Sequence, residues 1–272
     1  MNFVAIEESL FTLAFVLYIG ASLSFFIFLA SSKEKIGNIS VVISLLGFMI
    51  HTMAMGARII ESGRLPFSNQ YEFANSFTWG IVLCYLVIHF YYRFTAVGAF
   101  VMPLAFLMMG YASLLPRHVR PLMPALQSNW LIIHVGTAVV SYGAFAVAAG
   151  LSFIYLISFK KEASNKKSSL PDLDACDFLS YRIIAFGYLM LTLVIITGAI
   201  WARSAWSRYW GWDPKETWSL ITWIIYSVYL HLRYNRGWKG RPAAWFAVIG
   251  FIAVIFTFIG VNNLLPGIHS YR

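Results

Sequence analysis

Apolar segments long enough to cross a membrane recur along this whole chain and constrain its fold more than any other feature. Crossing about 30 Å of hydrocarbon takes roughly 20 apolar residues in a helix, and lipid satisfies no backbone polar group. Of the 272 residues, 60% are apolar and 11% charged, which excludes an ordinary soluble domain. We predict an all-α, polytopic membrane protein formed by residues 1–272 as a single integral membrane domain. About eight transmembrane helices fit, near residues 9–30, 39–60, 73–92, 95–115, 129–158, 178–202, 215–234 and 243–264.

The distribution of lysine and arginine predicts the orientation of these helices. With the N-terminus outside, the inner loops hold 12 of the 20 cations and the outer side holds 8. The two most basic loops, KKEASNKK and RYNRGWKGR, then both lie inside. The charges sit in short loops between spans, so the net charge of +9 indicates no nucleic-acid partner.

Eight outer cations are more than this charge rule favours. They are Arg58, Arg64, Arg117, Arg120, Arg203, Arg208, Lys215 and Arg272. An anionic ligand or partner would explain them, since arginine suits the recognition of planar carboxylates. Solvation in loops and pairing with nearby acidic residues would explain them equally well.

The two cysteines predict no thiol chemistry for the chain itself. Cys84 falls within a predicted span and Cys176 in a predicted hydrophilic loop, and the sequence contains no CxxC. A disulfide or a zinc site is therefore not expected.

Six of the ten tryptophans lie between Trp201 and Trp223, around a predicted outer loop at about residues 201–218. Tryptophan collects at membrane interfaces because its ring is apolar and its N–H needs a polar partner. The cluster is consistent with such an aromatic belt. Alternatively, it forms a flat aromatic platform for a large planar ligand.

The end of this stretch has the pattern of a helix start. Asp213 can cap the helix, Pro214 suits its first position, and Glu216 stands where a capping box places an acid. We therefore expect Asp213 and Glu216 to begin the seventh span, with Trp218 and Trp223 on that helix.

Three histidines are candidate ligands. His134 lies near the outer end of the fifth span with Trp130 one turn earlier, and His269 lies in the outer tail. His231 lies near the inner end of the seventh span. Two outer imidazoles, an indole cluster and arginines would suit haem, whose iron takes axial histidines and whose propionates pair with arginine. A single histidine at the end of a span is more often an interfacial residue than a ligand.

Two residues of the second span are second-tier candidates. His51 and Arg58 stand seven residues apart on one helical face, toward the outer half of the span. Ionisable groups at such depth are candidates for function by default.

Three segments resemble one family. WSRYWGWDPKETWS (206–219) is similar to the tryptophan-rich WWD signature of the haem-handling proteins of cytochrome c maturation. Its DPKETWS part and the eight-span layout resemble the CcsA (ResC) type of system II. PFSNQYEF (66–73) and LMPALQSNWLIIHV (122–135) resemble family segments too, which indicates a haem-handling core over about residues 66–270. The family often has Trp-Gly where this chain has Trp206-Ser207.

The resemblance implies a path for haem b as a transported substrate. His231, with a histidine of a partner subunit, would receive haem near the inner side, and His134 and His269 would ligate its iron outside. The floor of that outer site would be Trp206, Trp210, Trp212 and Asp213, with Trp130, Glu216 and Trp218 as second-tier contributors. The chain supplies no catalytic residue of its own, since the reacting thiols belong to the CxxCH motif of an apocytochrome c.

The resemblance also implies partners and a location. We expect a CcsB (ResB)-type membrane partner, apocytochrome c and a thiol-reducing, thioredoxin-like protein, in a bacterial plasma membrane in preference to a thylakoid. Two other functions stay open: a haem exporter or chaperone without ligation activity, and a b-type electron-transfer subunit, which would need histidine pairs at matching depth.

Overall fold

Most of the part of the chain that the structure describes is helical. The computed structural model describes residues 2–119, 121–162, 172–265 and 267, and among these there is no strand. Seven of the described helices are long and apolar enough to cross a membrane. The chain divides into two compact units, residues 1–121 and 122–272.

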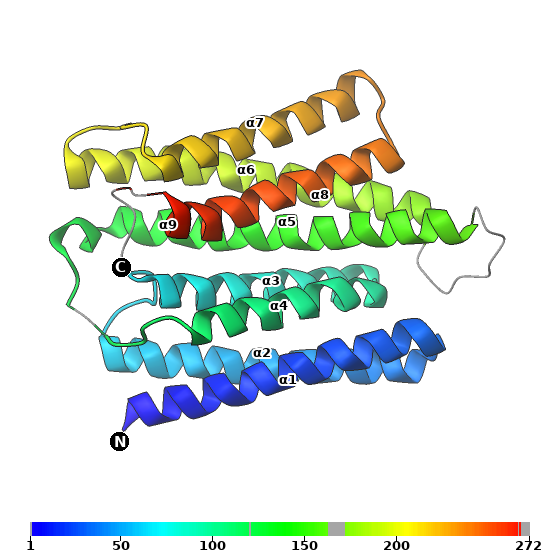
Figure 1. The fold of residues 1–272 in the computed structure, drawn as a ribbon, viewed down its shortest axis with the longest axis horizontal. Coiled ribbons are helices and arrows are strands. Elements are labelled where there is room, and N and C mark those ends of the chain that lie inside the picture. The colour runs from blue at the N-terminus through cyan, green and yellow to red at the C-terminus, as the bar shows by residue number, and fades with distance from the viewer. Residues whose placement is uncertain (1, 120, 163–171, 266, 268–272) are drawn as a thin grey trace. The chain divides into compact units, whose positions relative to one another are not determined.

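Unit 1 consists of four long helices (Figure 1). They are α1 (Phe3–Ser31), α2 (Glu34–Ser62), α3 (Gln70–Tyr92) and α4 (Gly98–Ser113), with the short helix η1 (Thr95–Val97) before α4. Glycines allow close approach: a Cβ at Gly98 would lie 2.3 Å from the ring of Phe25, and one at Gly47 would lie 2.8 Å from the ring of Tyr18. Small residues at helix contacts are typical of membrane bundles.

Unit 2 is built around two helices of 34 residues each, α5 (Asn129–Glu162) and α6 (Leu173–Trp206). The turn η2 (Pro124–Leu126) precedes α5, and α7 (Pro214–Asn235) and α8 (Arg241–Ile255) follow α6. A π-helical turn, η3 (Phe256–Gly260), continues α8 into the short α9 (Val261–Leu264). Figure 1 shows α9 beside the first turns of α7.

The sixth helix begins earlier than predicted. Asp172 caps α6 by accepting a hydrogen bond from the Ala175 amide at 2.9 Å, so the helix already includes Cys176. The prediction that Cys176 lies in a hydrophilic loop was therefore wrong, because the thiol is buried within the helix. Neither Cys84 nor Cys176 forms a disulfide with a described residue.

Helix α7 differs from the other long helices in composition. Polar and charged residues at both of its ends make it too polar to count among the seven candidate spans. Its buried residues are Thr222, Tyr226 and Tyr229, which follow one face at intervals of four and three. The eighth span and the outside N-terminus stay predictions.

The π-helical turn after α8 and the short helix α9 contact the first half of α7. The hydroxyls of Thr257 and Thr222 lie 3.1 Å apart, and the Lys215 ammonium donates to Asn262 Oδ1 at 3.0 Å. The Trp218 indole packs on Phe256 with ring centroids 4.3 Å apart. The tryptophan-rich connection, which joins α6 to α7, therefore ends on a helix whose position is fixed by contacts with the C-terminal segment.

Candidate functional site

The connection from α6 to α7 turns sharply at Ser207. This residue is the C-cap of α6 and has a φ of 58°, in the left-handed region that favours glycine. Its amide donates to the Arg203 carbonyl at 3.1 Å. A glycine would adopt this conformation without the strain that a side-chain-bearing residue meets there.

The predicted capping box at the start of α7 is confirmed. Asp213 Oδ1 accepts from the Lys215 amide at 2.9 Å, and Glu216 Oε2 accepts from the Asp213 amide at 3.2 Å. The same Glu216 oxygen also accepts from the Gly211 amide at 2.8 Å. Asp213 and Glu216 thus fold the tryptophan-rich connection onto the helix that follows.

The indoles of this connection do not form one flat platform. Trp201 and Trp206 meet edge to face at 61°, and Trp210 and Trp212 at 88°. Trp212 has a φ of 55° and is 70% exposed. The segment therefore presents aromatic faces in several directions, with Trp212 the most open of them.

His134 of α5 is held against α6 in a defined tautomer. Its Nδ1 lies 2.8 Å from the carbonyl oxygen of Val194, so Nδ1 carries the proton and donates it. The lone pair of the neutral ring then resides on Nε2, as in metal-binding histidines whose other nitrogen donates to a backbone carbonyl. Gly198 provides the space, because a Cβ there would lie 2.8 Å from Cε1 of the imidazole.

Trp201 connects His134 to the turn before α5. The indole stacks on the imidazole at 27° with centroids 5.9 Å apart, and its Nε1–H donates to the Ala125 carbonyl at 2.9 Å. Trp130, one turn before His134, is part exposed. Histidine, indole and turn form one assembly. The contribution of Gly198 was not predicted, because its only signal in the sequence is a glycine inside an apolar helix.

The C-terminal segment returns to the start of α7. A Cβ at Gly267 would lie 2.5 Å from Asp213 Oδ2, so the backbone there lies against the buried carboxylate. Gly267 is two positions before His269, which lies outside the described residues.

His231 is exposed near the other end of α7. The Asn235 side-chain nitrogen lies 2.9 Å from its Nδ1, so this nitrogen accepts and the proton resides on Nε2, the opposite tautomer to His134. The helix end is anchored two residues later, where Arg233 Nη1 donates to both carboxylate oxygens of Asp177 at 2.8 Å. Asp177 Oδ1 also accepts from the Gly240 amide at 2.9 Å.

Comparison with known proteins identifies the family. A sequence model described as "Cytochrome C assembly protein" matches residues 67–269. The chain is 38% identical over 253 residues to the cytochrome c biogenesis protein CcsA of Guillardia theta, covering 84% of this chain and 83% of that one. The chain belongs to the CcsA-type cytochrome c assembly proteins. The CcsA of Mesostigma viride is 35% identical over 303 residues, covering 100% of this chain and 98% of its own, and that of Prochlorococcus marinus (strain NATL1A) 38% over 244 residues, covering 78% of each.

A solved structure shares the fold of this CcsA-type protein. The cytochrome c haem lyase CcmF superposes with a TM-score of 0.71 at 14% identity over 95% of this chain. The chain spans about half the length of that protein, 47% of it. Family and fold together make this a multi-pass membrane protein of cytochrome c biogenesis.

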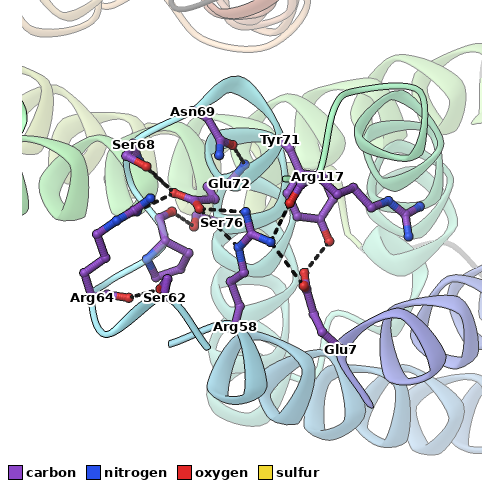
Figure 2. A network of polar contacts seen from close by, with 11 residues as sticks. Glu7, Arg58, Ser62, Arg64, Ser68, Asn69, Tyr71, Glu72, Ser76 and Arg117 are labelled. Carbon is purple, nitrogen blue, oxygen red and sulfur yellow. Dashed lines mark hydrogen bonds and ion pairs between the residues drawn. The ribbon is translucent and has the colours of Figure 1, made fainter. Parts of the chain in front are cut away.

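In unit 1 of this CcsA-type protein, Arg58 is the centre of a buried polar network (Figure 2). The guanidinium is 2% exposed and donates to Glu72 Oε1 through Nε and Nη2, at 3.1 and 2.9 Å. Its Nη1 donates to Glu7 Oε2 at 3.3 Å and to the Arg117 carbonyl at 2.7 Å. Arg64 pairs with the other oxygen of Glu72 at 3.0 Å. Arg58 thus ties α1, α2, α3 and the segment after α4 together.

His51, the other second-tier residue, has both ring nitrogens engaged. Its Nε2–H donates to Asn75 Oδ1 at 2.7 Å, and the Tyr18 hydroxyl donates to Nδ1 at 3.2 Å. The ring is fully buried. This geometry favours a structural connection between α1, α2 and α3 of the CcsA-type unit over a role in ligation.

Proposed function

We propose that this CcsA-type protein presents haem b at the tryptophan-rich connection, for covalent attachment to the CxxCH cysteines of apocytochrome c. The chain crosses a bacterial plasma membrane eight times, α7 included, with its N-terminus outside. The connection then faces the outer side, and the site consists of His134, His269, Trp206, Trp210, Trp212 and Asp213.

The arrangement of His134 carries this proposal. An imidazole whose Nδ1 donates to the Val194 carbonyl keeps its lone pair on Nε2, the atom that would bind iron. Its ring is stacked on Trp201 and backed by Gly198, so its direction is fixed before a ligand arrives. The second axial ligand is His269, and the position of Gly267 against Asp213 supports this assignment, because Gly267 is only two residues away from His269 in the chain.

The chain contributes to this reaction by positioning the haem vinyl groups and the thiols. Thioether formation joins haem vinyl groups to thiols of the apocytochrome, so the protein needs no nucleophile of its own. Holding the vinyl groups beside the thiols converts an encounter of two molecules into a local reaction, which is the proximity effect. Because iron–imidazole bonds exchange, the histidine of CxxCH can replace an axial ligand at release.

His231 is the proposed receiving ligand near the inner side, shared with a histidine of a CcsB (ResB)-type partner. Its Nδ1 now accepts from Asn235, and exchanging the oxygen and nitrogen of that amide by rotation places a proton on Nδ1 and the lone pair on Nε2. A thioredoxin-like protein keeps the apocytochrome thiols reduced.

The absorption spectrum of the purified full-length protein tests the site. We expect His134→Ala to shift the bands of bound haem and to lower its amount, and added imidazole to restore them by filling the vacated position. His118→Ala, at an exposed histidine of unit 1, is the matched control. An unchanged spectrum with full activity in the His134 variant would contradict the proposal.

A reporter experiment separates ligation from transport alone. The chain is expressed with its CcsB-type partner and an apocytochrome carrying CxxCH, in a host that lacks its own maturation system. Covalent haem on the reporter supports synthesis, and bound haem without covalent product would indicate an exporter or chaperone.

A further inference from the structure

Three of the cations that are predicted to lie outside are in or beside the tryptophan-rich connection, and two of them have partners within the chain. Arg203 donates to the Ser207 carbonyl and lies over the Tyr209 ring, with its Cζ 5.8 Å from the centroid. Lys215 donates to Asn262. Arg208 makes no hydrogen bond, ion pair or ring contact with any described residue.

The guanidinium of Arg208 is nevertheless placed by the loop. A Cβ at Gly211 would lie 2.6 Å from Arg208 Cζ, 2.7 Å from Nε and 2.8 Å from Nη2. The group therefore rests against the bare α-carbon of Gly211, in the loop that carries Trp210 and Trp212, and the residue is exposed. Any larger residue at 211 would displace it.

The carboxylates at the end of the same loop already accept hydrogen bonds from backbone amides. Glu216 Oε2 accepts from the Gly211 and Asp213 amides, and Asp213 Oδ1 accepts from the Lys215 amide. The loop thus places the Arg208 guanidinium beside its tryptophans, while its own carboxylates are bonded to backbone amides. Five N–H donors in a planar fork match a carboxylate in two-point contact.

We propose that Arg208 binds a propionate carboxylate of the haem presented at this connection, and thereby selects and orients the porphyrin edge opposite the vinyl groups. This inference rests on the proposed function. Arginine is better suited than lysine to the role, because two parallel hydrogen bonds fix the angle of the carboxylate as well as its position.

Comparing haem with haem dimethyl ester, whose propionates are esterified, tests Arg208 directly. The purified full-length protein is titrated with each porphyrin, and the ratio of the two dissociation constants is measured. We expect the protein to prefer haem by about 3- to 10-fold, in the range of a part-exposed charge-assisted hydrogen bond. Arg208→Gln should bring the ratio close to 1.

Two further variants make the test specific. Gly211→Ala keeps the arginine but displaces its guanidinium, so it should also reduce the ratio, without loss of the folded state because the displaced group is the end of a flexible side chain. Arg203→Gln is the control in the same segment and should keep the ratio of the unaltered protein.

The outcomes separate the two proposals. Equal binding of both porphyrins by the unaltered protein, or an unchanged ratio in Arg208→Gln, overturns the role of Arg208 while a His134-dependent spectrum keeps the haem site. A spectrum that does not depend on His134 with either porphyrin overturns the proposed site and the role of Arg208 together.

Discussion

Gly198 of α6 lies directly against the imidazole of His134 on α5. A Cβ at position 198 would lie 2.8 Å from Cε1 and 2.9 Å from Nδ1 of that ring. The hydrogen bond from Nδ1 to the Val194 carbonyl depends on this space. The glycine therefore sets the direction of the histidine that we propose as an iron ligand.

Replacing Gly198 by alanine should turn the His134 ring away from Val194. We expect shifted haem bands and weaker haem binding, while the helix itself gains up to about 1 kcal/mol from the better helix former. Absorption spectra and thermal denaturation measure the two effects. Gly136→Ala in α5 is the control, since a Cβ there meets nothing within 4 Å. Unaltered haem spectra in Gly198→Ala would show that the ring position does not matter.

The network around Arg58 should dominate the stability of unit 1. Arg58→Met leaves the carboxylates of Glu7 and Glu72 buried without their main partner, and breaking a buried pair in this way costs about 3–5 kcal/mol. Arg64→Met removes one pair of a more exposed arginine and should cost clearly less. Thermal denaturation in detergent compares the two variants, and equal losses would contradict the central position of Arg58.

Ser207→Gly should stabilise the protein or leave it unaltered. The residue has a φ of 58°, and left-handed backbone costs a side-chain-bearing residue about 1 kcal/mol that glycine avoids. Ser204→Gly, within the last turns of α6, should instead destabilise by about 0.5–1 kcal/mol. A loss of stability in Ser207→Gly would show that the serine side chain contributes more than the backbone conformation does.

His51→Leu should lower stability without altering bound haem. The variant leaves the Tyr18 hydroxyl and the Asn75 amide oxygen without their buried partner, at a cost of about 1–3 kcal/mol. Denaturation and absorption spectra are compared with those of His118→Leu, at an exposed position. Loss of haem from His51→Leu at retained stability would restore His51 as a ligand candidate.

Much of the architecture was predictable because lipid imposes simple rules. Helices follow from the length of apolar segments, and the capping box at Asp213 follows from local spacing. Cys176 was placed wrongly because α6 extends past its apolar part to the cap at Asp172. Polar residues within a helix cost little free energy when a cap and neighbouring helices satisfy their hydrogen bonds. A hydropathy pattern does not indicate such contacts.

The candidate site was predictable in its residues and not in its geometry. The histidines and tryptophans stand out by type, but the angles between indoles depend on two left-handed residues, Ser207 and Trp212. The tautomer of His134 depends on a carbonyl 60 residues away in the chain, that of Val194. Such contacts arise only when α5 and α6 pack together, so no local sequence pattern predicts them.

The π-helical turn at Phe256–Gly260 has a consequence for how the C-terminal segment tolerates change in length. A π turn accommodates one residue more than the α repeat, and each α-helical residue advances by about 100°. Deleting one residue within 256–260 would therefore restore the regular α repeat and leave the residues after it on their present faces. Deleting one residue from the regular part of α8 would instead rotate everything after it by about 100° and turn Asn262 away from Lys215. The effect of a single-residue deletion in this helix thus depends on whether it falls within the π-helical turn.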